Sequence, residues 1–260
     1  MRRARQVLGK TSGEKPAPAY GPRAPVGIPG FDEIVGGGLP TGHSILILGE
    51  PGAGKTVFAL QFLINGINRF DENGVYVSLF KNKQQCYDEA KSFGWDFEAA
   101  ERQKKFMFID ASPMPGSDKT LTLITPDFTV SKLLATVKGA VEEIGAKRMV
   151  IDKLSMLDYH FLNERERWRA ILEIYLGLLE THATCLLLSD IRTMGSLFRR
   201  RFLPEEYLFQ GTILMHTISA GRTMERTIQV EKLQSLIDRQ PRPYRITENG
   251  IEIYPRESVI

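Results

Sequence analysis

The residues best suited to chemistry lie in one run, GEPGAGKT, which spans residues 49–56. The run matches the pattern G-x-x-x-x-G-K-[ST] at every fixed position. Gly49, Gly52 and Gly54 allow the backbone to curl so that its N–H groups point toward phosphate oxygens. We expect Lys55 to reach the β- and γ-phosphates and Thr56 to place its hydroxyl on Mg²⁺. The run therefore predicts a binding site for a nucleoside triphosphate and Mg²⁺.

The residues around this run form the elements that such a site needs. Residues 45–48 (ILIL) are an apolar run typical of a buried strand, and apolar side chains from Val57 to Ile67 recur at helical spacing. The new helix would add the positive end of its dipole to the phosphate site. The residues predicted to contact the nucleotide are Gly49, Glu50, Pro51, Gly52, Ala53, Gly54, Lys55, Thr56 and Val57.

The rest of the chain alternates between strand and helix patterns up to about residue 210, and beyond that it contains only strands and turns. The alternation predicts an α/β fold with a mostly parallel sheet covered by helices on both faces. The later segments predict an antiparallel extension. Expected strands cover residues 74–79, 105–110, 148–152, 184–189, 211–219, 223–233 and 244–254. Expected helices begin at Asn82 and Val130, and a further helix carries the apolar positions from Trp168 to Leu179.

Composition fits one large globular domain, because the chain has 260 residues of which 42% are hydrophobic and 25% charged. Cys86 and Cys185 lie in apolar contexts and are expected to be small buried side chains. The sequence has neither a signal peptide nor ~18 consecutive apolar residues, the length of a membrane span. These features predict a cytoplasmic protein without a membrane segment.

Charge is distributed unevenly along the chain. Residues 1–24 hold six basic residues against one acidic residue, a charge of 6 − 1 = +5, so residues 25–260 carry 3 − 5 = −2. With Pro16, Pro18 and Pro22 as well, residues 1–24 are predicted to be a flexible basic arm. A solvated tail, an acidic partner and nucleic acid remain alternatives for it. Residues 25–260 are predicted to form a single nucleotide-binding domain.

A second motif precedes the first directly. Residues 26–44 read VGIPGFDEIVGGGLPTGHS, and residues 250–255 read GIEIYP. Together with GEPGAGKT, these segments resemble the KaiC-like branch of the RecA superfamily of P-loop ATPases, over roughly residues 26–256. The resemblance implies a RecA-like core that binds ATP with Mg²⁺. The matching positions in the first segment are Gly27, Pro29, Gly30, Asp32, Glu33, Gly36, Gly37, Gly38, Pro40 and Gly42.

Two aspartates end predicted strands at positions where the family places nucleotide-binding residues. Asp152 closes the strand RMVID and is predicted to hold the Mg²⁺ shell together with Thr56. Asp190 follows strand 184–189, where relatives place a sensor of the γ-phosphate. A contact with Mg²⁺-bound water and an ordinary loop-starting aspartate are both open for Asp190.

The chain departs from the family at the end of strand 74–79. Relatives carry one or two glutamates there, and one of them orients the attacking water. Phe80 and Lys81 stand at those positions. A phenyl ring cannot accept a proton, and a lysine ammonium has no lone pair for that purpose. Asp88 and Glu89 come at least a turn into the next helix and are poor substitutes, so the resemblance predicts weak or absent ATP hydrolysis.

A second departure affects contacts between subunits. Relatives use a K-M-R-G segment to reach the γ-phosphate of a neighbouring subunit. Here the segment is KLQS, so Lys232 keeps one cation while Gln234 replaces the arginine. The retained Lys232 is predicted to act catalytically with Lys55 and Asp190. The resemblance further predicts a homo-oligomeric ring, of which a hexamer is favoured.

Three consecutive arginines form a candidate nucleic-acid site. Arg199, Arg200 and Arg201 lie between two phenylalanines, in the segment where RecA-like rings face their central channel. Such residues could hold phosphates and stack the bases of single-stranded DNA. Glu205 and Glu206 follow and offset part of the charge. A solvated loop or a subunit interface is the alternative.

These observations favour an ATP-binding KaiC-like regulatory module, assembled as a ring, acting with a protein partner that the sequence does not identify. The alternative is a DNA-binding ATPase of the RecA/RadA-paralogue type, acting in recombination or repair. A ring locked by nucleotide, with a purely structural role, is the third interpretation. The four histidines have no metal-ligand spacing with the cysteines and no nucleophile-elbow motif occurs, which excludes metal-hydrolase and acyl-transfer classes.

Overall fold

The structure is a computed structural model of the chain. It describes residues 21–114, 121–122, 125, 128–161, 163–191, 193–194, 199–200, 203–220, 223–233 and 240–257. Residues 1–20, which make up most of the predicted basic arm, lie outside the described residues.

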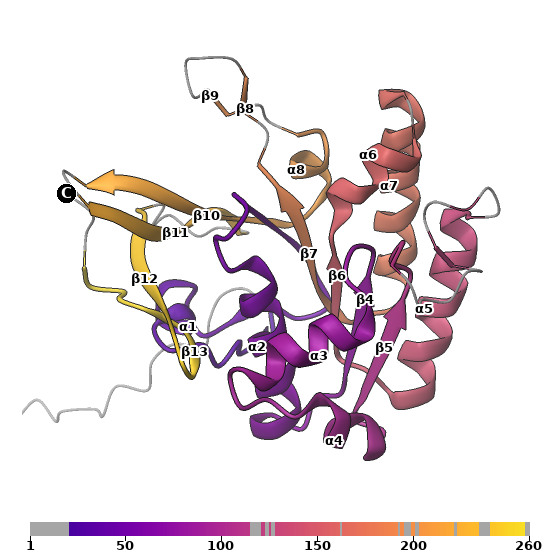
Figure 1. The fold of residues 1–260 in the computed structure, drawn as a ribbon, viewed down its shortest axis with the longest axis horizontal. Coiled ribbons are helices and arrows are strands. Elements are labelled where there is room, and N and C mark those ends of the chain that lie inside the picture. Colours follow the sequence, from indigo (N-terminus) through magenta and orange to yellow (C-terminus); the bar gives the residue numbers. More distant parts are fainter. Residues whose placement is uncertain are drawn as a thin grey trace, which may run out of the picture.

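One nine-stranded sheet runs through the domain in the order β13-β12-β11-β10-β3-β7-β6-β4-β5 (Figure 1). The strands from β10 to β5 in this order pair in parallel, whereas β10, β11, β12 and β13 pair antiparallel. This arrangement confirms the predicted mostly parallel sheet with an antiparallel extension. The strands are β3 (Ser44–Gly49), β4 (Gly74–Ser78), β5 (Phe106–Asp110), β6 (Arg148–Asp152), β7 (Thr184–Asp190), β10 (Gly211–Ala220), β11 (Thr223–Leu233), β12 (Arg242–Thr247) and β13 (Gly250–Ile253).

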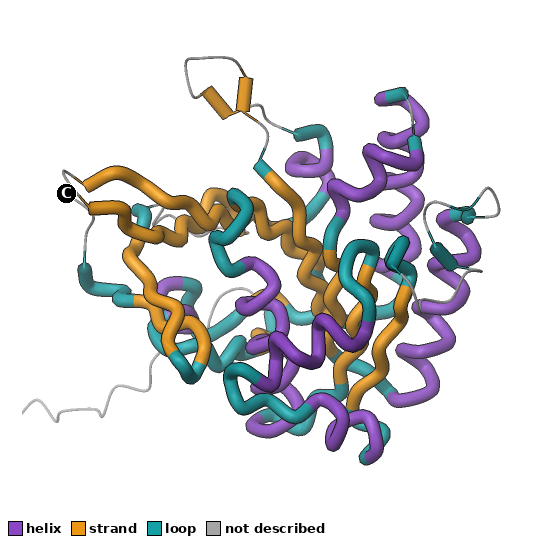
Figure 2. The backbone as a smooth tube through the Cα atoms, viewed as in Figure 1, coloured by secondary structure: helices purple, strands orange, loops and turns teal. Residues whose placement is uncertain are grey.

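Helices cover both faces of the parallel part. The long helices α2 (Lys55–Arg69) and α5 (Val130–Ile144) belong to opposite faces, and α5 packs beside α7 (Glu164–Leu179). In Figure 2 the helices gather around the parallel strands, while the β10–β11 pair extends to one side. The remaining helices are α1 (Phe31–Ile34), α3 (Lys83–Lys91), α4 (Phe97–Arg102), the 3-10 helix η1 (Leu154–Met156), α6 (Leu157–His160) and α8 (Glu205–Leu208).

Strand β3 shows how the sequence produces two cores. Ile45 and Ile47 pack into the cluster on the α2 face, and Leu46 and Leu48 pack into the cluster on the α5–α7 face. Successive side chains of a strand point to opposite faces, so a strand covered on both sides must be apolar throughout. The uninterrupted ILIL run is explained by this position at the centre of the sheet.

The short motif around Asp32 joins the two ends of the domain. The Asp32 carboxylate accepts hydrogen bonds from the backbone N–H groups of Val26 at 2.8 Å and Gly27 at 2.9 Å. Gly30 has a φ of 78°, and a Cβ there would lie 2.0 Å from the carbonyl oxygen of Ile253. The N-terminal motif is therefore packed directly against β13, which explains why glycine occupies this position.

Several short elements were not predicted from the sequence. Helices α4, α6 and α8 have only four to six residues, too few for helical periodicity to show. Strands β8 (Thr193–Met194) and β9 (Arg199–Arg200) pair with each other and lie apart from the large sheet (Figure 1), as do β1 (Arg23–Ala24) and β2 (Leu39–Pro40). The predicted helix from residue 130 and strand from residue 148 agree with α5 and β6.

Candidate nucleotide-binding site

Residues 49–56 connect the C-terminal end of β3 to the first turn of α2. Gly54 is the N-cap of α2 and has a φ of 86°, in the left-handed region that glycine adopts without strain. A Cβ on Gly49 would lie 2.7 Å from the carbonyl oxygen of Met215 on the neighbouring β10. The glycines of the motif are therefore required by a tight turn at one position and a close backbone approach at the other.

Lys55 is folded back onto its own loop. Its Nζ donates hydrogen bonds to the carbonyl oxygens of Gly49 at 2.8 Å and Glu50 at 3.0 Å, and lies 3.2 Å from Oδ1 of Asp190. Burial lowers the pKa of Lys55, and the Asp190 carboxylate partly offsets this effect. The lysine is thus held by groups that a bound phosphate would have to replace.

Thr56 and Asp152, the two predicted metal ligands, lie in direct contact. Thr56 Oγ1 donates to Oδ2 of Asp152 at 2.9 Å, and Tyr76 Oη donates to the same oxygen at 2.7 Å. Asp152 is 4% exposed, and burial raises its pKa although both hydrogen bonds act to lower it. Hydroxyl and carboxylate oxygens are ligands that Mg²⁺ accepts. The donor set therefore fits the predicted ion.

Asp190 lies between two lysines. Its Oδ1 pairs with Lys55 at 3.2 Å, and its Oδ2 pairs with Nζ of Lys153 at 2.6 Å. Ser155 Oγ donates to Oδ2 at 3.1 Å. Burial disfavours the charged form of Asp190, but the hydrogen bond from Lys153 and the charges of both lysines outweigh it and lower the pKa. The structure places Asp190 beside Lys55, and its predicted role stays a prediction; Lys153, its second partner, was not among the residues predicted from the sequence.

Phe80 and Lys81 follow β4 in the loop beside this cluster and supply no carboxylate. The Nζ of Lys153 lies 5.0 Å from the centroid of the Phe80 ring. Lys81 pairs with Glu89 of α3, whose Oε2 is 2.5 Å from Nζ. Glu89 occupies the helix position expected of it, yet its carboxylate turns back toward the end of β4. A lysine already neutralises that carboxylate.

Open volume lies beside the Asp190 carboxylate. A cavity of about 700 Å³ is bounded by residues from the ends of β4, β6 and β7 and from α6. Its wall combines carboxylates and one lysine with aromatic and thioether side chains. The lining residues are Phe80, Lys153, Ser155, Met156, Asp158, Tyr159 and Asp190.

Strands of the antiparallel extension contact the loop of residues 49–56 through two hydrogen bonds. Tyr244 of β12 donates a hydrogen bond to the carbonyl oxygen of Ala53, and burial raises the pKa of this tyrosine. The backbone N–H of Thr217 in β10 donates to Oε2 of Glu50 at 3.3 Å. These contacts cross more than 160 positions of sequence. No local pattern could have shown them.

Lys232 engages this chain's own backbone. Its Nζ donates to the carbonyl oxygens of Phe209 at 2.7 Å and Glu206 at 3.1 Å, at the C-terminal end of α8. A cation at the end of a helix satisfies carbonyls that lack intrahelical partners. Gln234 lies outside the described residues. The role of Lys232 between subunits stays a prediction.

The arginine segment is only partly described. The backbone of Arg199 and Arg200 forms β9, with Arg200 opposite Thr193 and Arg199 opposite Met194. Arg201 lies outside the described residues. The possible contact with DNA therefore stays a prediction.

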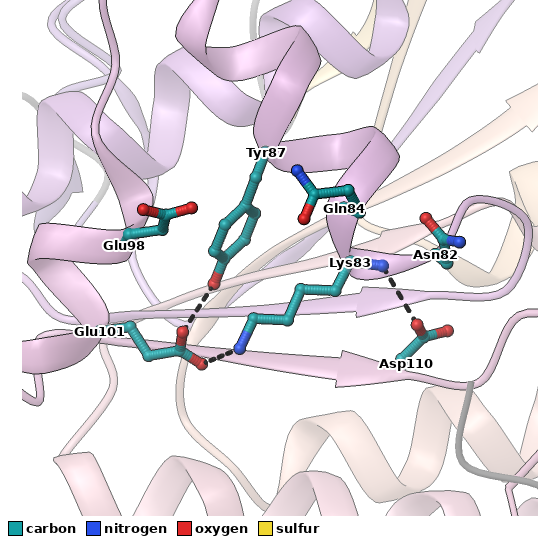
Figure 3. A pocket seen from close by; sticks show the side chains of 7 residues that line it. All are labelled: Asn82, Lys83, Gln84, Tyr87, Glu98, Glu101 and Asp110. Atoms are coloured by element: carbon teal, nitrogen blue, oxygen red, sulfur yellow. Dashed lines mark hydrogen bonds and ion pairs between the residues drawn. The ribbon is translucent and has the colours of Figure 1, made fainter. Parts of the chain in front are cut away.

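A separate cavity of about 470 Å³ lies between α3, α4 and the end of β5. Figure 3 shows the side chains of Lys83 and Tyr87 both directed at Glu101, with distances of 2.7 Å and 3.1 Å to its carboxylate oxygens. Residues 49–56 do not line it.

Two other kinds of site are absent from the described ranges. These ranges hold no cluster of three or more histidine, cysteine or acidic side chains that could bind a metal ion. None of the helices in these ranges has the length and apolar composition that a membrane span requires.

Comparisons with known proteins point to one family. A sequence profile described as the KaiC ATPase matches residues 24–258. The circadian clock oscillator protein KaiC of Synechococcus elongatus is 31% identical over 230 residues, covering 88% of this chain and 43% of that protein. KaiC of Parasynechococcus marenigrum is 33% identical over 240 residues, covering 90% and 45%. This chain thus spans about half the length of these curated relatives.

A solved structure shows the same fold over the whole domain. The KaiC-like protein from the archaeon Pyrococcus horikoshii OT3 superposes with a TM-score of 0.77 at 31% identity. The match covers 90% of this chain and 99% of the archaeal chain. The predicted RecA-like P-loop fold and the KaiC-like resemblance are both confirmed.

Proposed function

This chain belongs to the KaiC family of ATPases, and we propose that it is a regulatory member that binds ATP with Mg²⁺ and hydrolyses it slowly or not at all. One observation carries the proposal. Lys55 lies on its own loop and Thr56 contacts Asp152, as expected of a nucleotide site, while the segment after β4 offers a phenyl ring and a paired lysine rather than carboxylates.

The binding half of the proposal rests on Lys55, Thr56 and Asp152. Lys55 would leave the carbonyl oxygens of Gly49 and Glu50 to meet the β- and γ-phosphates. Thr56 and Asp152 would hold Mg²⁺, which neutralises charge on those phosphates when it is bound. The Thr56–Asp152 hydrogen bond of 2.9 Å keeps both oxygens close together.

The hydrolytic half rests on Phe80 and Lys81. Loss of a positioned general base typically costs ~10²–10⁴ in rate. Glu89 is held in an ion pair with Lys81 at 2.5 Å, so its carboxylate already has a partner other than an attacking water. We infer that nucleotide occupancy, rather than rapid turnover, is the signal that this protein transmits to its partner.

Ring assembly is part of the same proposal. In the isolated chain Lys232 is held by carbonyl oxygens of α8. A contact with a neighbour's γ-phosphate would require it to leave them. Assembly in the presence of ATP, measured by light scattering, would show whether nucleotide promotes oligomers, and a hexamer is the favoured product.

The experiment combines binding and turnover. We expect ATP–Mg²⁺ to bind tightly in calorimetry while phosphate release stays far below ~10 s⁻¹, the median for enzymes. The Phe80→Glu/Lys81→Glu double variant should release phosphate faster, and Lys55→Ala added to it should remove the gain. Ordinary turnover of the unmodified protein would refute the hydrolytic half, and absence of ATP binding would refute the whole. Stimulation by single-stranded DNA would favour the alternative, a recombination or repair ATPase.

A further inference from the structure

We propose that Lys153 is a γ-phosphate ligand supplied from within the same chain, and that the Asp190 carboxylate occupies the γ-phosphate position until ATP displaces it. This inference rests on the proposed ATP binding and adds a residue to that site. Lys153 would then supply, in cis, a cation for the terminal phosphate.

The geometry of Asp190 carries the argument. One carboxylate is held by two ammonium groups, with Lys55 on Oδ1 at 3.2 Å and Lys153 on Oδ2 at 2.6 Å. The P-loop motif assigns Lys55 to the β- and γ-phosphates. On this proposal, the Asp190 oxygen that pairs with Lys55 marks where a phosphate oxygen would lie. Lys153 contacts the other oxygen of the same carboxylate.

Apart from the Asp190 carboxylate, the surroundings of Lys153 do not neutralise its charge in the contacts described. Its ammonium lies over the Phe80 ring at 5.0 Å, an attraction that orients a cation without neutralising it. A glutamate in place of Phe80 would form a second ion pair with Lys153 and hold it away from the phosphate. The Phe80 ring thus orients the Lys153 ammonium and, unlike a carboxylate, does not pair with it.

There is room for the exchange. The cavity of about 700 Å³ is bounded by both Lys153 and Asp190, so the carboxylate can turn aside when a phosphate enters. Two adjacent anions repel each other, which means that the γ-phosphate and Asp190 compete for the two lysines. ADP has no γ-phosphate, so it can engage Lys55 through its β-phosphate but leaves the Lys153–Asp190 pair in place. The arrangement therefore predicts that Lys153 distinguishes ATP from ADP.

The test is a comparison of dissociation constants for ATP and ADP, each with Mg²⁺, measured on the full chain. Lys153→Met should weaken ATP binding by about 10- to 100-fold, the effect of one charge-assisted hydrogen bond, and change ADP binding by less than about threefold. Lys153→Arg should keep the preference for ATP. The matched control is Lys83→Met, which removes a lysine paired with Glu101 outside the site and should change neither constant.

A double variant separates a phosphate ligand from a lysine that only neutralises Asp190. If neutralisation were the sole role, Lys153→Met would not change ATP affinity once Asp190→Asn is present, and the inference would fall. A phosphate ligand makes Lys153→Met/Asp190→Asn bind ATP more weakly than Asp190→Asn alone. Equal weakening of ATP and ADP in a folded Lys153→Met protein, or no weakening, would also overturn the inference.

The remaining outcomes are equally decisive. If Lys153→Met does not fold, Asp190→Asn provides the test. Removing a competitor of the γ-phosphate must not lower the affinity for ATP relative to that for ADP. A lower relative affinity for ATP in this variant would overturn the inference. Failure of the proposed function looks different, because the unmodified protein would then bind neither nucleotide. Binding of both nucleotides with no effect of Lys153 refutes the inference alone.

Discussion

Replacing Thr56 with valine tests the core of the site, because it deletes one hydroxyl and keeps the side-chain volume. Thr56 Oγ1 donates to the buried carboxylate of Asp152 at 2.9 Å, which leaves Tyr76 as the other donor to that oxygen. A hydrogen bond to a charged group contributes about 1.5–3 kcal/mol. For a domain of this size, the melting temperature without nucleotide should therefore fall by about 3–12 °C.

The same substitution should act separately on the nucleotide complex. The unmodified protein should bind ATP more tightly with Mg²⁺ than with EDTA, because Thr56 and Asp152 both provide oxygen ligands to the ion. In Thr56→Val the enhancement by Mg²⁺ should shrink by about tenfold or more, equivalent to ~1.4 kcal/mol. Calorimetric titrations with ATP in each condition give the ratio, and thermal melts in EDTA give the stability.

Thr212→Val is the matched control. Its hydroxyl is buried in β10 and has no hydrogen-bond partner among the residues that the structure describes. Replacing an unsatisfied buried hydroxyl with a methyl group is nearly neutral or stabilising. If Thr56→Val melted like Thr212→Val, and its affinity for ATP kept the full response to Mg²⁺, the assignment of Thr56 to the ion would be refuted.

Two further predictions concern buried charges. Arg148 is fully buried and donates hydrogen bonds to Glu72 and to two backbone carbonyl oxygens. Arg148→Met should therefore destabilise the domain by about 3–5 kcal/mol, which lowers the melting temperature by about 6–20 °C. ATP affinity measured by calorimetry should not change. Asp152 has a pKa that burial raises above its unfolded value, so its contribution to stability is present below the unfolded pKa and is lost as pH rises through the folded pKa. The amide oxygen of Asp152→Asn can accept both hydrogen bonds and carries no charge. We therefore expect this variant to raise the urea midpoint of unfolding in EDTA at pH 8, and we expect the gain to shrink toward pH 4. The same variant should abolish the response of ATP binding to Mg²⁺.

The parts of the fold that the sequence predicted are those dictated by local patterns. The P-loop run, the apolar β3 and the amphipathic α5 each carry their own signal, and α5 begins after a Thr129 cap as the pattern requires. Asp152 and Asp190 could be predicted because the carboxyl ends of parallel strands meet at one edge of the sheet. What the sequence could not show was which cations would face them.

The missed residues depend on contacts between distant segments. Tyr76 reads as an ordinary apolar strand position, yet its hydroxyl reaches Asp152 across 76 positions. Tyr244 reaches Ala53 across 191 positions. Lys153 follows Asp152 directly and was still overlooked, because its meaning depends on Asp190 in the next strand. In the sequence alone, Lys153 is only a lysine that follows a strand-ending aspartate. The tertiary fold brings the Asp190 carboxylate to it.

The substitutions at the end of β4 are best understood together with Lys153. A carboxylate at position 80 would lie beside this lysine and would be drawn into an ion pair, which lowers the basicity of the carboxylate by favouring its charged form. Lys81 already holds the Glu89 carboxylate in an ion pair at 2.5 Å. On the proposed assignment, Lys153 would reach an incoming phosphate by exchanging it for the Asp190 carboxylate. We therefore expect a site with these lysines, and without a carboxylate at positions 80 and 81, to hold the triphosphate rather than cleave it.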